Sequence, residues 1–288
     1  MAEDPVSALF SGMASTIKRL ASGEQHAVEP RHAATVILLR DGDDGLEVYL
    51  LRRSASMSFA PGAFVFPGGS TDARDETFDE SAWVGPSPRE WAQQLRSNEL
   101  TARALVCAAV RETFEESGVL LAGPDAGRVV SGTGTAEWEN DRAALLDRSM
   151  SLAAMMTRRS LVLRSDLLRM WAHWITPEVE SRRFDTRFFV AAMPPGQHTR
   201  DVGGESDRVL WARPVQALEA QQRKEMSLMP PTQTALTEIA EFATVADVMA
   251  TAEAREVEPV LPKVILDTNE RIRFLLPHDP DYPREESR

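Results

Sequence analysis

One segment restricts what this chain can fold into more than any other: a run of small and apolar residues that continues directly into acidic ones. Residues 104–110 carry no charge, and 111–116 (Arg-Glu-Thr-Phe-Glu-Glu) follow without a break. Gly118 stands where a helix commonly ends. We therefore expect a helix over residues 101–117, capped near Asn98 or Thr101, with a buried first half and an acidic second half.

The spacing of the acids places three carboxylates together. On a helix, Glu112 shares a face with both Glu115 and Glu116, because residues three and four apart are neighbours. Two such charges about 4 Å apart repel by roughly 4 kcal/mol at an effective dielectric near 20. A hard cation such as Mg²⁺ or Mn²⁺, which prefers oxygen ligands, would remove that repulsion. The alternative is a solvated acidic face, against which the apolar first half of the helix argues.

A strand that ends in paired glycines precedes this helix. Residues 62–66 are mostly apolar and pass into Pro67-Gly68-Gly69. Earlier, two apolar segments over 32–40 and 46–51 flank the turn signal 41–45 (Asp-Gly-Asp-Asp-Gly), which indicates a hairpin.

Residues 111–119 resemble the second half of the Nudix box, whose pattern is Arg-Glu-apolar-any-Glu-Glu-any-Gly-apolar, and Phe66-Pro67-Gly68-Gly69 is similar to the strand and turn before that box. The resemblance implies that the chain is a Nudix hydrolase cleaving a phosphoanhydride bond. It implies a metal role for Glu112, Glu115 and Glu116 and a bracing role for Arg111. Gly68 and Gly69 then form the turn at the substrate.

Two positions depart from the Nudix pattern. Thr113 occupies a usually apolar position. The first Glu of the box falls at Asp75, and Arg111 comes 36 residues later instead of eight, so about 28 residues are inserted. We therefore do not assign Asp75 as a metal ligand.

The fold class implied is α/β: a Nudix-type α/β/α sandwich with a mixed curved sheet and extra helices. We expect an N-terminal arm over 1–30 with a short amphipathic helix and a Nudix domain over 31–250 with an insertion at about 76–103. A C-terminal extension over 251–288 would pack on the domain or be partly disordered. The insertion resembles the branch of large Nudix proteins related to the peroxisomal coenzyme A diphosphatases of animals, as do residues 174–177, 183–189 and 228–232.

Further elements follow from the apolar patterns. Residues 138–172 and 232–250 each indicate a helix, and 119–121 a strand. Strands are also expected at 174–176, 187–192 and 209–212, and in the tail at 263–265 and 271–276.

Candidate substrate residues lie outside the acidic helix. Arg53, with Ser54 and Gly62, is similar to the signature of coenzyme A-cleaving Nudix proteins, although Ser58 stands where a later Arg is usual. Arg183 and Arg187 would clamp phosphates bidentately, or form local charge pairs. Glu205, after two glycines, would be a general base or an extra ligand, or a solvent-facing acid.

The substrate class expected from this resemblance is a nucleoside diphosphate linked to another moiety, with coenzyme A or acyl-coenzyme A favoured. NADH, ADP-ribose and dinucleoside polyphosphates are alternatives, as is a Nudix module that binds a nucleotide without cutting it. The net charge of −12 disfavours nucleic-acid binding. The expected partner is a small nucleotide-type molecule, and a homodimer is left open.

The cysteine content and the absence of long apolar segments indicate the compartment of the protein. Cys107 is the single cysteine, so no disulfide can form within the chain, and its apolar neighbours indicate a buried small side chain. The sequence begins without a basic and apolar leader and has no stretch of membrane-spanning length, so we expect a cytoplasmic protein without a membrane partner.

Overall fold

The computed structural model describes residues 5–54, 60–201 and 206–283. The chain forms two compact units. The first comprises Met1–Arg31, His173–Thr186 and Glu258–Arg288, and the second comprises His32–Ala172 and Arg187–Val257. The second unit contains the acidic helix and the glycine turn.

A mixed sheet runs through the second unit. Its strands are β1 (Arg31–Gly42), β2 (Gly45–Arg53), β3 (Ala63–Val65), β4 (Gly68–Ser70), β8 (Arg169–Ile175), β9 (Phe184–Ala192), β10 (Ser206–Ala212) and β11 (Ser227–Leu228). The order is β11-β3-β2-β1-β9-β8, with β10 on β2 and β4 on β1. β1 and β2 are antiparallel, which confirms the predicted hairpin, whereas β11 and β3 are parallel.

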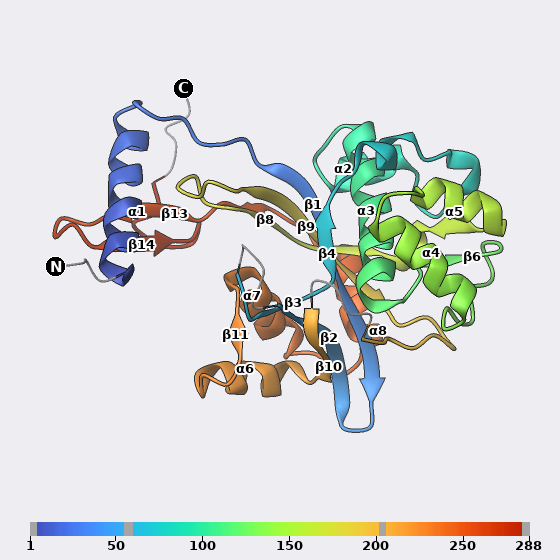
Figure 1. Cartoon of the computed structure of the whole chain (residues 1–288). Coiled ribbons are helices and arrows are strands. Elements are labelled where there is room, and N and C mark those ends of the chain that lie inside the picture. Colours follow the sequence, from blue (N-terminus) through green and yellow to red (C-terminus); the bar gives the residue numbers. More distant parts are fainter. Residues whose placement is uncertain (1–4, 55–59, 202–205, 284–288) are drawn as a thin grey trace. The chain divides into compact units, whose positions relative to one another are not determined.

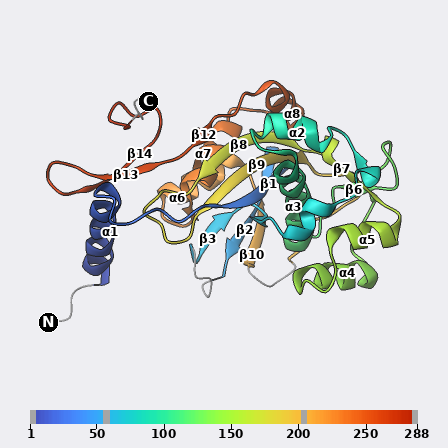
Figure 2. The same ribbon diagram turned by 90° about the horizontal axis from the view of Figure 1, so that it is seen from above.

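Helices cover the strands of this unit from two sides. α2 (Pro88–Gln94), α3 (Glu99–Ser117), α4 (Ala136–Leu146) and α5 (Leu152–Arg159) lie on one side of β1, β2 and β9. α6 (Pro214–Gln222) and α7 (Pro230–Ile239) lie on the other side (Figures 1 and 2). This arrangement confirms the predicted class, an α/β sandwich with additional helices.

The acidic helix, α3, forms where the sequence predicts it. The Asn98 side chain accepts a hydrogen bond from the Thr101 amide at 2.8 Å, and Gly118 closes the helix with a φ of 74°. Glycine adopts this left-handed conformation without a steric penalty. Leu105 and Phe114 are fully buried in a core shared with β1, and each buried side chain of this size contributes roughly 1.5–3 kcal/mol. The last turn of α3 contains no Lys or Arg.

The single helix predicted over 138–172 is wrong. α4 and α5 are separate helices, and α5 ends at Ser160, whose φ is 54°. After it come β7 (Val162–Arg164), the 3₁₀ helix η3 (Ser165–Leu167) and then β8. The buried Leu163 pairs with Trp83 and with Ala122 in a short sheet, so this leucine packs from a strand and not from a helix face.

Two other predicted elements need correction. Residues 119–121 are buried but form no strand, because the Gln197 side chain takes both the N–H and the C=O of Leu120; β6 (Ala122–Gly123) begins after them. The helix predicted over 232–250 is two helices, α7 and α8 (Val245–Ala254). Thr244 starts the second by accepting from the Asp247 amide.

The insertion contributes short elements beside α3. These are the 3₁₀ helices η1 (Ala73–Thr77) and η2 (Glu80–Ala82), the strand β5 (Trp83–Val84), and α2. β5, β7 and β6 form a separate three-stranded sheet. Ser87 and Glu90 form a reciprocal capping box that starts α2, and the buried Trp91 ring packs edge-on against Phe189.

The first unit contains α1 (Pro5–Ala21), β12 (Pro259–Val260), β13 (Lys263–Leu266) and β14 (Ile272–Leu275). β13 and β14 pair antiparallel, and β12 pairs with His173 and Trp174 of β8. The predicted N-terminal helix and tail strands are therefore present. In the part of the chain that the structure describes, no helix has the length and apolarity needed to cross a membrane.

Candidate active site

The glycine turn rests directly on the acidic helix. β4 pairs with β1, so that Gly69 lies opposite Ala34, and the Gly68 amide donates to a Glu116 carboxylate oxygen at 2.8 Å. A Cβ added at Gly69 would lie 2.5 Å from the carboxylate of Glu112, closer than real contacts allow. The two glycines and two of the three glutamates are therefore brought together, and this approach requires a residue without a side chain.

Arg111 holds the turn, the helix and the insertion together. Its Nη1 donates to Glu112 at 2.6 Å and lies 3.4 Å from a Glu115 oxygen, and its Nη2 donates to the Ser70 carbonyl at 2.9 Å. The same Nη2 donates to Asp75 at 3.1 Å. Burial lowers the pKa of Arg111, but these three carboxylates outweigh burial and raise it. Such contacts are what the Nudix resemblance implies for this arginine.

The carboxylates carry a large electrostatic cost. Glu115 is only 6% exposed, and burial, followed by the charge of Glu112, raises its pKa to about 7. Burial also raises the pKa of Asp75, despite its ion pair with Arg111. One guanidinium therefore offsets only part of the negative charge gathered here.

The donor set fits a hard divalent cation, because it consists of carboxylate oxygens beside a glycine turn. Among the described residues, however, no three His, Cys, Asp or Glu side chains are arranged to hold a metal ion. Nη1 of Arg111 contacts both Glu112 and Glu115 instead. Metal binding by Glu112, Glu115 and Glu116 thus stays a prediction.

A second support of the acidic helix has no signal in the sequence. The Arg200 amide donates to the Ser117 carbonyl at 3.1 Å, and its guanidinium lies over Gly118. The hydroxyl of the buried Tyr49, on β2, donates to the Arg200 carbonyl at 3.2 Å. Burial, then the charges of Asp201 and Glu116, raise the pKa of Tyr49.

The predicted substrate residues of the second unit lie on the sheet. Arg53 ends β2, where its carbonyl accepts from the Gly62 amide at 3.0 Å. Arg187 on β9 is 3% exposed and donates to the Leu95 carbonyl at 3.2 Å. Contact with a phosphate stays a prediction for both arginines.

The roles of two other predicted site residues, Arg183 and Glu205, also stay predictions. Arg183 belongs to the first unit, where its guanidinium donates to the carbonyls of Val28 and Thr176 at 2.7 and 2.9 Å. Glu205, like Ser58, lies outside the described residues, so its role as a base also stays a prediction.

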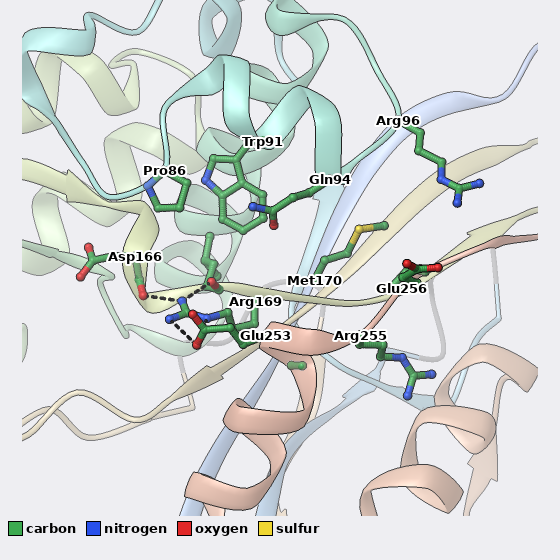
Figure 3. A pocket seen from close by; sticks show the side chains of 13 residues that line it. Pro86, Trp91, Gln94, Arg96, Asp166, Arg169, Met170, Glu253, Arg255 and Glu256 are labelled. Carbon is green, nitrogen blue, oxygen red and sulfur yellow. Dashed lines mark hydrogen bonds and ion pairs between the residues drawn. The ribbon is translucent and has the colours of Figure 1, made fainter.

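A cavity of about 460 Å³ lies elsewhere in the second unit, between α2, α8 and the start of β8 (Figure 3). Its wall includes Trp91, Met170 and Arg169, and Arg169 donates to the Asp166 and Leu168 carbonyls. None of the predicted site residues lines it. Cys107 does not contribute to either place: it is fully buried as predicted, and burial raises the pKa of its thiol.

A mixed sheet between helical layers, with a glycine turn seated on an acidic helix, defines the class of Nudix hydrolases. The model of the NUDT19 Nudix domain matches residues 87–239. The chain therefore belongs to the NUDT19 Nudix domain family, which confirms the branch that the sequence resembles.

Curated relatives and a solved structure agree with this assignment. The chain is 30% identical to the acyl-coenzyme A diphosphatase NUDT19 of Homo sapiens, over 83% of this chain and 73% of the relative. It is 28% identical to the Xenopus laevis protein of that name, over 83% and 72%. The crystal structure of a Nudix hydrolase from Alicyclobacillus acidocaldarius is similar with a TM-score of 0.63 and 31% identity, covering 78% of this chain and 97% of that one.

Proposed function

We propose that this protein hydrolyses the diphosphate bond of coenzyme A or an acyl-coenzyme A in a metal-dependent reaction. The observation that carries the proposal is a match over most of the chain to relatives named acyl-coenzyme A diphosphatase. The contact between the glycine turn and the glutamates of α3 supports it. Water attacks one phosphorus, one P–O bond of the diphosphate breaks, and two phosphomonoesters leave.

The chain's own groups supply orientation and charge at this site. Glu112, Glu115 and Glu116 would bind Mg²⁺ or Mn²⁺, and a bound divalent ion would polarise the attacking water and neutralise phosphate oxygens. The Gly68 amide fixes one Glu116 oxygen at 2.8 Å. Arg111 fixes the turn through the Ser70 carbonyl and, once displaced from the glutamates, offers a guanidinium to a phosphate.

A hydrolysis screen tests this function. Coenzyme A, an acyl-coenzyme A, NADH, ADP-ribose and a diadenosine polyphosphate are each incubated with Mg²⁺, with Mn²⁺ or with a chelator, and product masses locate the cleaved bond. We expect adenosine 3′,5′-bisphosphate and a phosphopantetheine product from the coenzyme A substrates, with metal only. Faster cleavage of NADH or ADP-ribose would overturn the coenzyme A proposal, and binding without turnover would favour a non-catalytic module.

The compartment and the partners of the enzyme are part of the proposal. We propose a cytoplasmic protein that acts on a small nucleotide, does not bind nucleic acid and can form a homodimer. Cell fractionation and light scattering coupled to size-exclusion chromatography test the compartment and the oligomeric state.

A further inference from the structure

A second cavity, of about 430 Å³, lies in the same unit as the acid site. Its walls come from the end of β2, from β3, and from the turn between α6 and β11, which Figure 1 shows beside β3. The residues that matter most are Arg52, Phe64, Gln221, Lys224 and Glu225. The size falls within the range of small-ligand sites.

The charges in this wall favour an anion. Arg223, outside the wall, pairs with Glu225 at 3.1 Å, so the one acid of the lining is already compensated. Arg52 contacts Asp207 at 2.6 Å, and both of these side chains are more than a third exposed. Lys224 is exposed, and among the residues that the structure describes it forms no ion pair. An unpaired ammonium beside a guanidinium attracts a phosphomonoester.

A hydrogen-bond acceptor in the wall is also unused. The Gln221 side-chain amide donates from Nε2 to Gln233 at 3.0 Å, which fixes its orientation. Its Oε1 is buried and accepts from no described residue. A ligand bearing an N–H group beside its phosphate would satisfy this oxygen.

Only a few residues separate the wall of this cavity from the acid site along the chain. Phe64 in the cavity wall precedes Gly68 by four residues, so their backbones are at most about 14 Å apart. Gly68 is the residue whose amide holds Glu116. In a nucleotide that carries a 3′-phosphate, one ribose separates the phosphomonoester from the diphosphate. The long side chains of Lys224 and Arg52 cover part of the remaining distance, so one substrate can span the two places.

We propose that this cavity binds the phosphorylated nucleoside end of the substrate, with Lys224 and Arg52 contacting its 3′-phosphomonoester. This inference rests on the proposed function, because it explains how coenzyme A would be preferred over diphosphates that lack this group. Lys224 is a specificity residue and takes no part in bond cleavage.

The test compares coenzyme A with dephospho-coenzyme A, which lacks the 3′-phosphate. Lys224→Gln should lower kcat/KM for coenzyme A by roughly tenfold or more through KM, since it removes a charged hydrogen bond. It should leave kcat, and all constants for dephospho-coenzyme A, unchanged. Lys263→Gln is the matched control, because Lys263 pairs with Glu178 at 2.9 Å and does not line the cavity.

Two outcomes overturn the inference: equal losses on both substrates, or no loss on either. Calorimetric titration with adenosine 3′,5′-bisphosphate gives a readout that needs no turnover. If the wild-type enzyme cleaves neither substrate, the proposed function fails. The titration still shows whether the cavity binds the phosphorylated nucleoside. Weaker binding by Lys224→Gln than by Lys263→Gln supports it, and equal binding by both overturns it.

Discussion

Asp75 and Arg111 are 36 positions apart in the sequence and form a buried ion pair, with Oδ2 and Nη2 3.1 Å apart. Asp75 lies in η1, directly after the glycine turn, and its side chain also caps that 3₁₀ helix. The inserted segment therefore lies between two residues that contact each other in the folded protein. Asp75 supports the arginine of the site even though we do not assign it as a metal ligand.

Replacing Asp75 should weaken both the fold and the reaction. Asp75→Ala removes the acceptor of the hydrogen bonds from Arg111 and from the Asp72 amide, and should lower the free energy of unfolding by about 1–3 kcal/mol, since buried donors are left unsatisfied. Urea denaturation measures this. The neighbouring Glu76 is exposed, so Glu76→Gln should change stability by less than about 0.5 kcal/mol. Equal effects of the two substitutions would contradict a bracing role for Asp75.

Glu116→Gln should abolish most activity while the protein stays folded. The amide still offers an oxygen to the Gly68 N–H but loses the negative charge that the proposed cation site needs. We expect turnover to fall at least about a hundredfold, which corresponds to about 2.7 kcal/mol of lost transition-state stabilisation. Glu99→Gln, at the exposed first turn of the same helix, is the control and should keep full activity. A fully active Glu116→Gln enzyme would refute the ligand assignment.

The metal-free protein should lose stability as the pH rises. The pKa of Glu115 is about 7 in the folded chain against an ordinary value of 4.5, so the folded state binds its proton more tightly than the unfolded state. The resulting stabilisation is complete below pH 4.5 and disappears as the pH rises through 7. Thermal melts in a chelator from pH 5 to 8 measure the slope, which Glu115→Gln should flatten. An unchanged slope in that variant would exclude Glu115 as the cause.

Divalent metal should stabilise the protein more at pH 8 than at pH 5.5. Protons and the cation compete for the same carboxylate oxygens, so binding tightens as Glu115 loses its proton. At a hundredfold excess over the dissociation constant, the metal adds about 2.7 kcal/mol. Melts with and without Mg²⁺ or Mn²⁺ at the two pH values provide the comparison. An increment independent of pH, or no increment, would speak against carboxylate ligation.

The two glycines of the turn should respond differently to a methyl group. At Gly69 the new Cβ meets the side chain of Glu112, which can move, so Gly69→Ala should cost activity more than stability. At Gly68 it meets the Ala34 carbonyl at 2.6 Å, which is backbone, so Gly68→Ala should destabilise the fold. Gly132→Ala, with open space around it, is the control. Activity assays and melts of all three variants separate the two effects.

The sequence predicts those elements whose determinants lie within one short segment of the chain. The Asn98 cap and the Gly118 stop fix the ends of α3 within one stretch of chain, and the spacing of Glu112 and Glu115 follows from helix geometry. The helix prediction is wrong after Ser160, where a left-handed residue ends α5 and Leu163 enters a short strand. The number of apolar residues does not indicate where the backbone changes direction.

Contacts between distant segments were beyond prediction from one sequence. Nothing near Tyr49 or Arg200 indicates that the first donates to the second and that both support the end of α3. Likewise, Gln197 resembles any loop glutamine, yet its amide replaces strand pairing at Leu120. These contacts arise from packing between segments far apart in the chain.

The end of α3 also has a consequence for the living cell. Backbone carbonyls at a helix C-terminus add their own partial negative charge to Glu115 and Glu116. The last turn of α3 has no basic residue of its own, so Arg142, which donates to the Glu115 carbonyl at 2.9 Å, and Arg200, whose guanidinium lies over Gly118, offset part of this charge from other segments. In the proposed function, a divalent cation supplies the rest of the counter-charge. The lifetime of this protein against proteolysis should accordingly follow the supply of free divalent cations, so that metal starvation depletes the enzyme itself as well as its catalytic rate.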